Sequence, residues 1–171
     1  MHKKLMMIAL LGALSAAPVA AQTNVGVVDF EVVIQKSTKG KAFFEELNQF
    51  REAKKADLDA RVAAYQEKQK DAQAKAASLS EDKKVALGQE LQQMQTDLKR
   101  FQEDAERATQ VKVKTGLDVI QKQLVPLVRQ IALEKDLHLV LHYGQQSEIV
   151  FFHDKINITA DVIKKYDESS N

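Results

Sequence analysis

The stretch from Lys41 to Lys135 contains one proline, Pro126, and two glycines, Gly88 and Gly116. Nearly all of its other residues are Ala, Lys, Glu, Gln, Asp, Arg or Leu. Most of these residue types have high helix propensity, whereas proline and glycine are the two types that most disfavour a helix interior. The sequence therefore predicts long α-helices here, and not the mixed elements of an ordinary globular core.

Apolar residues recur every three or four positions in two narrow stripes along this stretch, as they do on amphipathic helices. Between the stripes, Ser80 followed by Glu81 and Asp82 is typical of a helix N-terminus. Two stripes joined by a turn near Ser78 predict an antiparallel helical hairpin. The stripe residues are Phe43, Leu47, Phe50, Lys54, Leu58, Val62, Tyr65, Gln69, Ala72 and Ala76, then Val85, Gly88, Leu91, Met94, Leu98, Phe101, Ala105, Ala108, Val113, Leu117, Ile120, Leu124, Leu127 or Val128, and Ile131.

The returning helix carries its larger aliphatic residues between Val113 and Ile131. We expect this part to pack against the rest of the protein and the tip of the hairpin to lie in solvent. Pro126 lacks an amide donor and clashes with the preceding turn, so we expect a kink between Lys122 and Pro126 unless a new helical segment starts there.

Short segments rich in β-branched and aromatic residues flank the helical stretch on both sides. Val25 to Phe30 predicts a buried strand, and Leu137 to Tyr143 with Glu148 to Phe152 predicts a β-hairpin. Short helices are expected at Glu31 to Ser37 and at Ala160 to Tyr166. The expected capping residues are Asp29, Ser37 or Thr38, and Thr159.

These elements predict an α+β fold with two parts. Residues 22–40 and 113–171 form a small β-rich body for oligomerisation, and residues 41–112 form a long antiparallel α-helical hairpin, the tentacle. The two segments of the body together contain 78 residues, and a domain of that size buries only a modest share of its surface. Three short strands also leave unpaired edges. Assembly of several copies into one shared core removes both difficulties, and a monomeric sheet covered by helices is the alternative.

Residues 1–21 have the organisation of a secretory signal sequence. Basic Lys3 and Lys4 precede an apolar stretch from Leu5 to Ala17, and small residues follow it. We expect cleavage after Ala21, and an uncleaved N-terminal anchor is the alternative. The rest of the chain has no second long apolar run and no cysteine, which favours an exported protein without disulfide bonds.

The balance of charge argues against nucleic-acid binding. The full sequence has 25 Lys and Arg against 24 Asp and Glu, and removal of Lys3 and Lys4 leaves 23 basic residues and a formal charge of −1. A protein that binds nucleic acid by releasing counterions normally has a clear basic excess.

Neither a catalytic nor a metal site is predicted. His138 and His142 share one face of the predicted strand, but no third ligand is evident, and His153 is the only other histidine after the signal sequence. Asp29 has no accompanying nucleophile, glycine-rich phosphate loop or paired acid, so a capping role is expected for it. We therefore expect no enzyme activity and no cofactor.

Three segments in this order resemble the Skp/OmpH family of periplasmic chaperones. They are VGVVDFEVVIQKSTKGKAF from Val25, LEKDLHLVLHY from Leu133 and ITADVIKKY from Ile158. The resemblance implies a homotrimer whose strands form a barrel-like body, while three tentacles enclose a cavity for unfolded outer-membrane proteins, without ATP and without an enzymatic step. It places the subunit interface at Val25, Val27, Val28, Leu139, Leu141, Val150 and Phe152, and the client-facing surface between about Leu58 and Leu98.

Within that surface, candidate client contacts are adaptable apolar residues and basic residues near the tip. The alternative for Val62, Tyr65, Val85 and Met94 is the seam between the two helices, whereas Leu87 is expected off the seam. Lys68, Lys70, Lys75, Lys83 and Lys84 either attract clients modestly or form a solvated helix face. Well-known family members are clearly basic and this chain is nearly neutral, so contact with lipid or lipopolysaccharide is expected to be weak.

Two functions of different classes fit the sequence. The first is an ATP-independent holdase of the periplasm, which needs a weak and broadly adhesive surface. The second is an envelope coiled-coil scaffold or adaptor that binds a folded partner, which needs a stable and specific stripe. The Ala- and Gln-rich tip favours the holdase.

Overall fold

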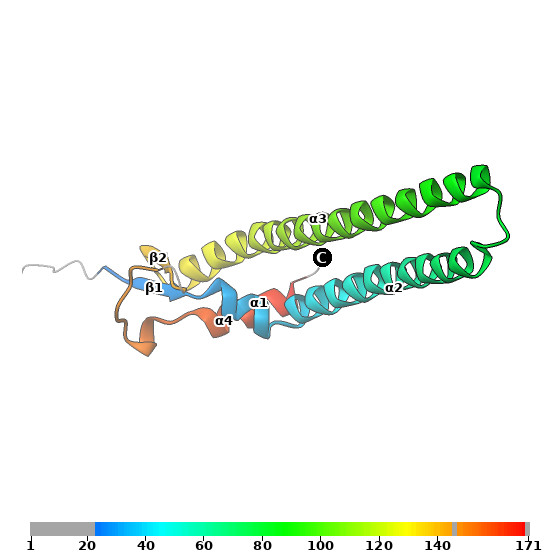
Figure 1. Cartoon of the computed structure of the whole chain (residues 1–171). Coiled ribbons are helices and arrows are strands. Elements are labelled where there is room, and N and C mark those ends of the chain that lie inside the picture. Colours follow the sequence, from blue (N-terminus) through cyan, green and yellow to red (C-terminus); the bar gives the residue numbers. More distant parts are fainter. Residues whose placement is uncertain (1–22, 145–146, 170–171) are drawn as a thin grey trace, which may run out of the picture.

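The computed structural model describes residues 23–144 and 147–169, so the predicted signal sequence lies outside the described residues. Two long helices lie side by side as an antiparallel hairpin, and the short elements gather at its open end (Figure 1). In chain order the elements are β1 (Val25–Val28), α1 (Phe30–Lys36), α2 (Thr38–Lys75), α3 (Glu81–Glu134), β2 (Leu139–His142), a 3-10 helix (Asp154–Ile156) and α4 (Thr159–Glu168).

The starts of α1 and α2 follow the capping residues expected from the sequence. Asp29 caps α1, since its Oδ1 accepts a hydrogen bond of 3.0 Å from the Val32 amide. Ser37 caps α2, and its buried Oγ accepts a 3.1 Å hydrogen bond from the Gly40 amide. The one residue between α1 and α2 is this serine, so the cap also fixes the angle at which the hairpin leaves the body.

The hairpin turn is confirmed between the end of α2 at Lys75 and the start of α3 at Glu81. Ser80 occupies the N-cap position but its side chain makes no capping hydrogen bond, and its carbonyl oxygen accepts from the Lys84 amide at 3.0 Å. Helix α3 then continues unbroken through Pro126, and no new segment starts there. Pro126 has no amide hydrogen, so the carbonyl oxygen of Lys122 loses its hydrogen bond within the helix. Both residues are exposed, so water can donate a hydrogen bond to that oxygen.

The sheet differs from the prediction. It has two strands in the described residues, and β1 pairs with β2 in parallel, with Val25 opposite Leu139 and Val28 opposite His142. The predicted β-hairpin is wrong, because no described residue from 147 to 152 is in a strand. The entire helical hairpin is the crossover between β1 and β2, and the other edge of β1 pairs at Val27 with Asn157.

The core lies where the lower half of α3 meets α1, α4 and β1. Its buried members are Val28, Val33, Ile120, Leu124, Ile131, Ile158, Val162 and Tyr166. This confirms that the returning helix packs against the body with its large aliphatic residues.

Helix α4 is tied to the other elements by polar contacts as well. The Tyr166 hydroxyl donates a 2.9 Å hydrogen bond to Gln123 Oε1, and burial raises the pKa of that phenol. The expected capping role of Thr159 is wrong, because Ile158 occupies the N-cap position. Thr159 Oγ1 instead accepts a 3.0 Å hydrogen bond from the Asp29 amide and so joins the start of α4 to the end of β1.

Gly40 leads to a prediction about the junction between body and hairpin. A Cβ atom at this position would lie 1.7 Å from the carbonyl oxygen of Ile34, which is backbone and cannot move aside cheaply. We expect Gly40→Ala to lower the free energy of unfolding by about 1–3 kcal/mol, measured by chemical denaturation. The matched control is Gly88→Ala, where a Cβ meets no atom within 4 Å and the better helix former stabilises by up to about 1 kcal/mol. Effects of the same sign at both positions would contradict this explanation.

Candidate functional site: the surface of the helical hairpin

One seam of buried and half-buried side chains joins α2 to α3. The seam includes Val62, Tyr65 and Met94, in agreement with the alternative prediction that these residues lie between the two helices. The seam contains Phe43, Leu47, Phe50, Lys54, Leu58, Val62, Tyr65, Lys68 and Ala72 from α2, and Leu87, Leu91, Met94, Leu98, Phe101, Ala105 and Ala108 from α3.

Near the tip, Val85 was predicted as a possible seam residue and Leu87 as a residue off the seam, and the structure shows the opposite. Val85 is 61% exposed, whereas Leu87 is half-buried. The seam therefore enters α3 at Leu87 and continues four residues later at Leu91, and the prediction that Leu87 lies off the seam is wrong. Gly88, which the sequence pattern placed in the stripe, is exposed, so at this point the predicted stripe ran one residue away from the seam.

At the base of the hairpin the two helices approach closely. A Cβ atom on Gly116 would lie 2.0 Å from Phe43 Cε2, so only glycine permits this contact. Higher up, Arg61 stacks over the Phe101 ring at 4.3 Å, and Lys54 lies between the rings of Phe50 and Phe101. Such cation–aromatic contacts add attraction across a seam that would otherwise be apolar only.

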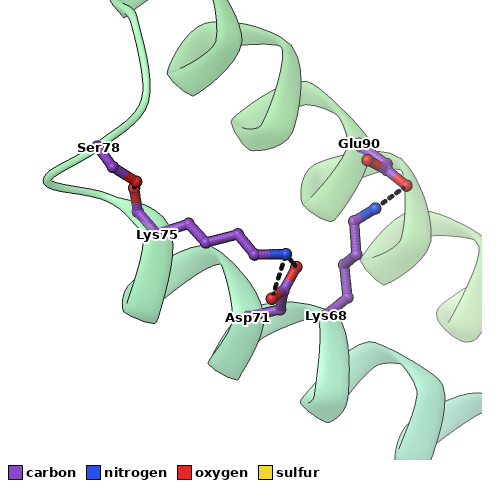
Figure 2. A network of polar contacts seen from close by, with 5 residues as sticks. All are labelled: Lys68, Asp71, Lys75, Ser78 and Glu90. Atoms are coloured by element: carbon purple, nitrogen blue, oxygen red, sulfur yellow. Dashed lines mark hydrogen bonds and ion pairs between the residues drawn. The ribbon is translucent and has the colours of Figure 1, made fainter.

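The tip carries three ion pairs made by the lysines that the sequence singled out, and Figure 2 shows two of them, those of Lys68 and Lys75. Lys68 Nζ lies 2.7 Å from Glu90 on the facing helix, and Lys75 Nζ lies 2.6 Å from Asp71 on its own helix. Lys84 pairs with Glu81 at 2.8 Å. Exposed Lys70 and Lys83 make no ion pair with the described residues. Much of the local positive charge is therefore balanced within the chain.

Two shallow grooves flank the lower hairpin, and the sequence prediction did not include them. An apolar groove of about 640 Å³ is lined chiefly by Phe43, Phe50, Val111, Val119 and Ile120. A second groove of about 450 Å³ has Leu58 and Ala105 in its wall together with three cations that pair with no described carboxylate; these are Arg51, Lys54 and Lys55. The available sequence signal was a second aliphatic row on α3, which includes the exposed residues Val111, Val119, Val125 and Leu133.

The predicted interface residues divide into two groups. Val27 and Val28 are buried in the core of the chain itself, and Val25 is half-buried. Leu139 and Leu141 of β2 and Val150 are exposed, and Val150 is 99% exposed next to Phe151 at 84%. Phe152 is half-buried, with its ring edge-on to Tyr143 at 4.9 Å. Exposed apolar side chains such as these are common at protein–protein contacts, so the body offers candidates for the predicted interface.

The histidines considered as metal ligands have structural contacts. His138 Nδ1 accepts a 3.1 Å hydrogen bond from the Asn24 amide, and the His142 ring stacks on Phe30 at 5.2 Å. His153 Nδ1 accepts from the Lys155 amide at the start of the 3-10 helix. Among the residues described, no three His, Cys, Asp or Glu side chains are grouped as a metal site requires.

None of the helices described for this chain combines the length and apolar character needed to cross a bilayer.

Comparisons with known proteins agree with this architecture. No curated protein matches the chain. The crystal structure of a protein from Caulobacter crescentus CB15, described as an OmpH-like outer membrane chaperone, superposes with a TM-score of 0.73 at 18% sequence identity. The match covers 86% of this chain and 85% of the other, so the two proteins share a fold. The family model for outer membrane protein (OmpH-like) matches residues 24–166, from the start of β1 almost to the end of α4. The chain is therefore a member of the OmpH-like family.

Proposed function

We propose that this protein is an ATP-independent holdase chaperone of the periplasm that binds unfolded outer-membrane proteins and prevents their aggregation. Family membership and the fold shared with an OmpH-like chaperone support a chaperone role. The observation that carries the proposal is the long hairpin, whose flanks combine shallow apolar grooves with unpaired cations. Such a surface offers many weak contacts, which suits clients of varied sequence.

Assembly into a homotrimer is part of the proposal. The body of one chain leaves β2 with an edge that pairs with no other described strand, and it exposes Leu139, Leu141, Val150 and Phe151. An exposed strand edge beside apolar side chains is a surface that another strand can cover. Three copies that share these surfaces would place three hairpins around one space, whereas Val27 and Val28 would support the sheet from inside each chain.

The client surface that we propose includes the residues expected from the sequence and the two grooves. Val85, Lys70 and Lys83 are exposed at the tip and free to contact a client, whereas Val62, Tyr65 and Met94 are partly covered by the facing helix. Four further residues are half-buried or ion-paired, and the exposed atoms of their side chains would also contact a client. They are Leu87, Lys68, Lys75 and Lys84. An apolar contact is worth about 1.5–3 kcal/mol when fully buried, so several partial contacts hold a client without trapping it.

The test is suppression of aggregation. A urea-unfolded outer-membrane β-barrel is diluted into buffer with the purified protein, and light scattering is recorded without nucleotide. We expect suppression at three chains per client. The double variant Val111→Ser with Val119→Ser should require several-fold more protein, because both residues line the apolar groove. Val125→Ser with Leu133→Ser is the matched control, since these residues are also exposed on α3 but lie outside the groove.

The same assay distinguishes the holdase from the competing scaffold function. A coiled-coil scaffold for a folded partner would leave the scattering of the unfolded barrel unchanged at any ratio. That result would remove the holdase proposal.

A further inference from the structure

The two helices of the hairpin are held together unevenly along their length. At the base, Lys112 Nζ lies 2.7 Å from Glu46 across the seam, and higher up Arg61 stacks on Phe101. The next charged contact between the helices is the ion pair of Lys68 with Glu90, at 2.7 Å. Among the residues described, no salt bridge nearer the tip joins α2 to α3. Lys68 and Glu90 therefore form the outermost charged contact between the two helices.

Packing also weakens beyond this pair. The seam there consists of small or half-buried side chains such as Ala72 and Leu87, and Val85 faces solvent. At the base, by contrast, the helices approach so closely that a Cβ atom on Gly116 would lie 2.0 Å from the Phe43 ring. The helices are thus tightly packed at the base and loosely packed at the tip, where few buried contacts oppose their separation.

The other ion pairs near the tip do not join the two helices, as Figure 2 shows for Lys75. Lys75 pairs with Asp71 one turn earlier in α2, and Lys84 pairs with Glu81 in the first turn of α3. Ser78 Oγ donates to the Lys75 carbonyl oxygen at 2.9 Å and closes the end of α2. These contacts stabilise each helix end separately, so apart from the turn itself and the weak packing of the seam, Lys68 and Glu90 make the contact that holds the two helices together here.

We propose that the ion pair of Lys68 and Glu90 is a clasp that controls the separation of the outer ends of α2 and α3. The Lys68 stem lies in the seam and its charged end reaches the facing helix, so the contact closes only when the helices lie together. The side chains are 35% and 52% exposed, which leaves the pair open to screening by salt. Opening and closing would then follow ionic strength without unfolding of either helix.

The expected size of the effect follows from the exposure of the pair. Exposed ion pairs contribute little, so loss of this one should change the ratio of open to closed tips about two- to fivefold. A change of that size is measurable as a broader distance distribution between two probes beyond the clasp. It is independent of any client, so its outcome does not depend on the holdase proposal.

The chain has no cysteine, so Ala74→Cys and Ala86→Cys add the only two sites for spin labels. Both alanines are exposed and lie on opposite helices beyond the clasp. Labelled protein is mixed with excess unlabelled protein so that pulsed dipolar spectroscopy measures distances within one chain. We expect a narrow distribution in low salt that broadens toward longer distances in 1 M NaCl. Glu90→Gln should give the broad distribution at both salt concentrations.

Two further variants make the result specific. Asp71→Asn removes the neighbouring ion pair within α2, and it should leave the distance distribution as in the parent protein. The exchange Lys68→Glu with Glu90→Lys restores an attractive pair and should restore the narrow, salt-sensitive distribution. If Glu90→Gln leaves the distribution unchanged, or if Asp71→Asn broadens it equally, the clasp proposal is overturned.

Discussion

Leu124→Ala is expected to lower the free energy of unfolding of the body by about 2–5 kcal/mol. Leu124 is 0% exposed and lies in the core with Val28, Val33, Val162 and Tyr166. The smaller side chain loses buried apolar contacts and leaves a cavity that the surrounding helices fill only in part. Because small domains have only about 5–15 kcal/mol of total stability, this one change should threaten folding of the body.

The matched control is Leu133→Ala, the same substitution on the same helix at a residue that is 75% exposed. It should change stability by no more than about 0.5 kcal/mol. Unfolding in urea is followed by near-ultraviolet circular dichroism of the tyrosines, because far-ultraviolet signal comes mostly from the long helices. Equal effects of the two substitutions would mean that Leu124 is not in the core that holds the body together.

Val150→Asp with Phe151→Asp is expected to abolish self-association and leave each chain folded. Both side chains are almost fully exposed in one chain, so the acidic residues cost little there. In an assembly, each loses about 1.5–3 kcal/mol of apolar burial and places a carboxylate in the interface. The dissociation constant between subunits should therefore rise by about 100-fold or more.

Sedimentation velocity over a range of concentrations measures this change. Ala76→Asp with Ala77→Asp is the control, because it adds the same charge at the exposed tip of the hairpin. The control should sediment as the parent protein does, and both variants should keep its helical circular dichroism. An unchanged assembly in the Val150 and Phe151 variant would exclude this segment from the subunit interface.

The helical part of the fold could be predicted because its signals are local. The stripe from Phe43 to Tyr65 and its partner from Leu91 to Ile131 place the seam correctly, and Ser37 and Asp29 cap the helices as expected. Spacing along one helix fixes which side chains share a face, whatever the rest of the chain does.

The sheet could not be predicted in the same way because its pairing is not local. Strand β2 is followed closely by another β-prone segment, which favoured a hairpin between them. The structure pairs β2 with β1 across the whole helical hairpin. Sequence patterns indicate that a segment is a strand, but its partner depends on packing of the lower half of α3 against the body.

At the candidate site, the register between α2 and α3 limited the prediction. The sequence pattern placed Gly88 in the stripe, but the structure places its neighbour Leu87 there. With this shift of one residue, Leu87 joins the seam and Val85 is exposed. The pairing of Lys68 with Glu90 also depends on this register, and neither residue reveals it alone. The two grooves were not predicted because they lie beside the seam, and only the apolar one has a signal in the sequence, the second apolar row on α3.

Native mass spectrometry of the purified protein with an unfolded outer-membrane β-barrel tests most directly whether several hairpins enclose one client. We expect a complex of three chains with one barrel protein, formed without nucleotide and absent for the Val150 and Phe151 variant. Binding of the client to single chains with the same affinity, or no complex at all, would contradict the account.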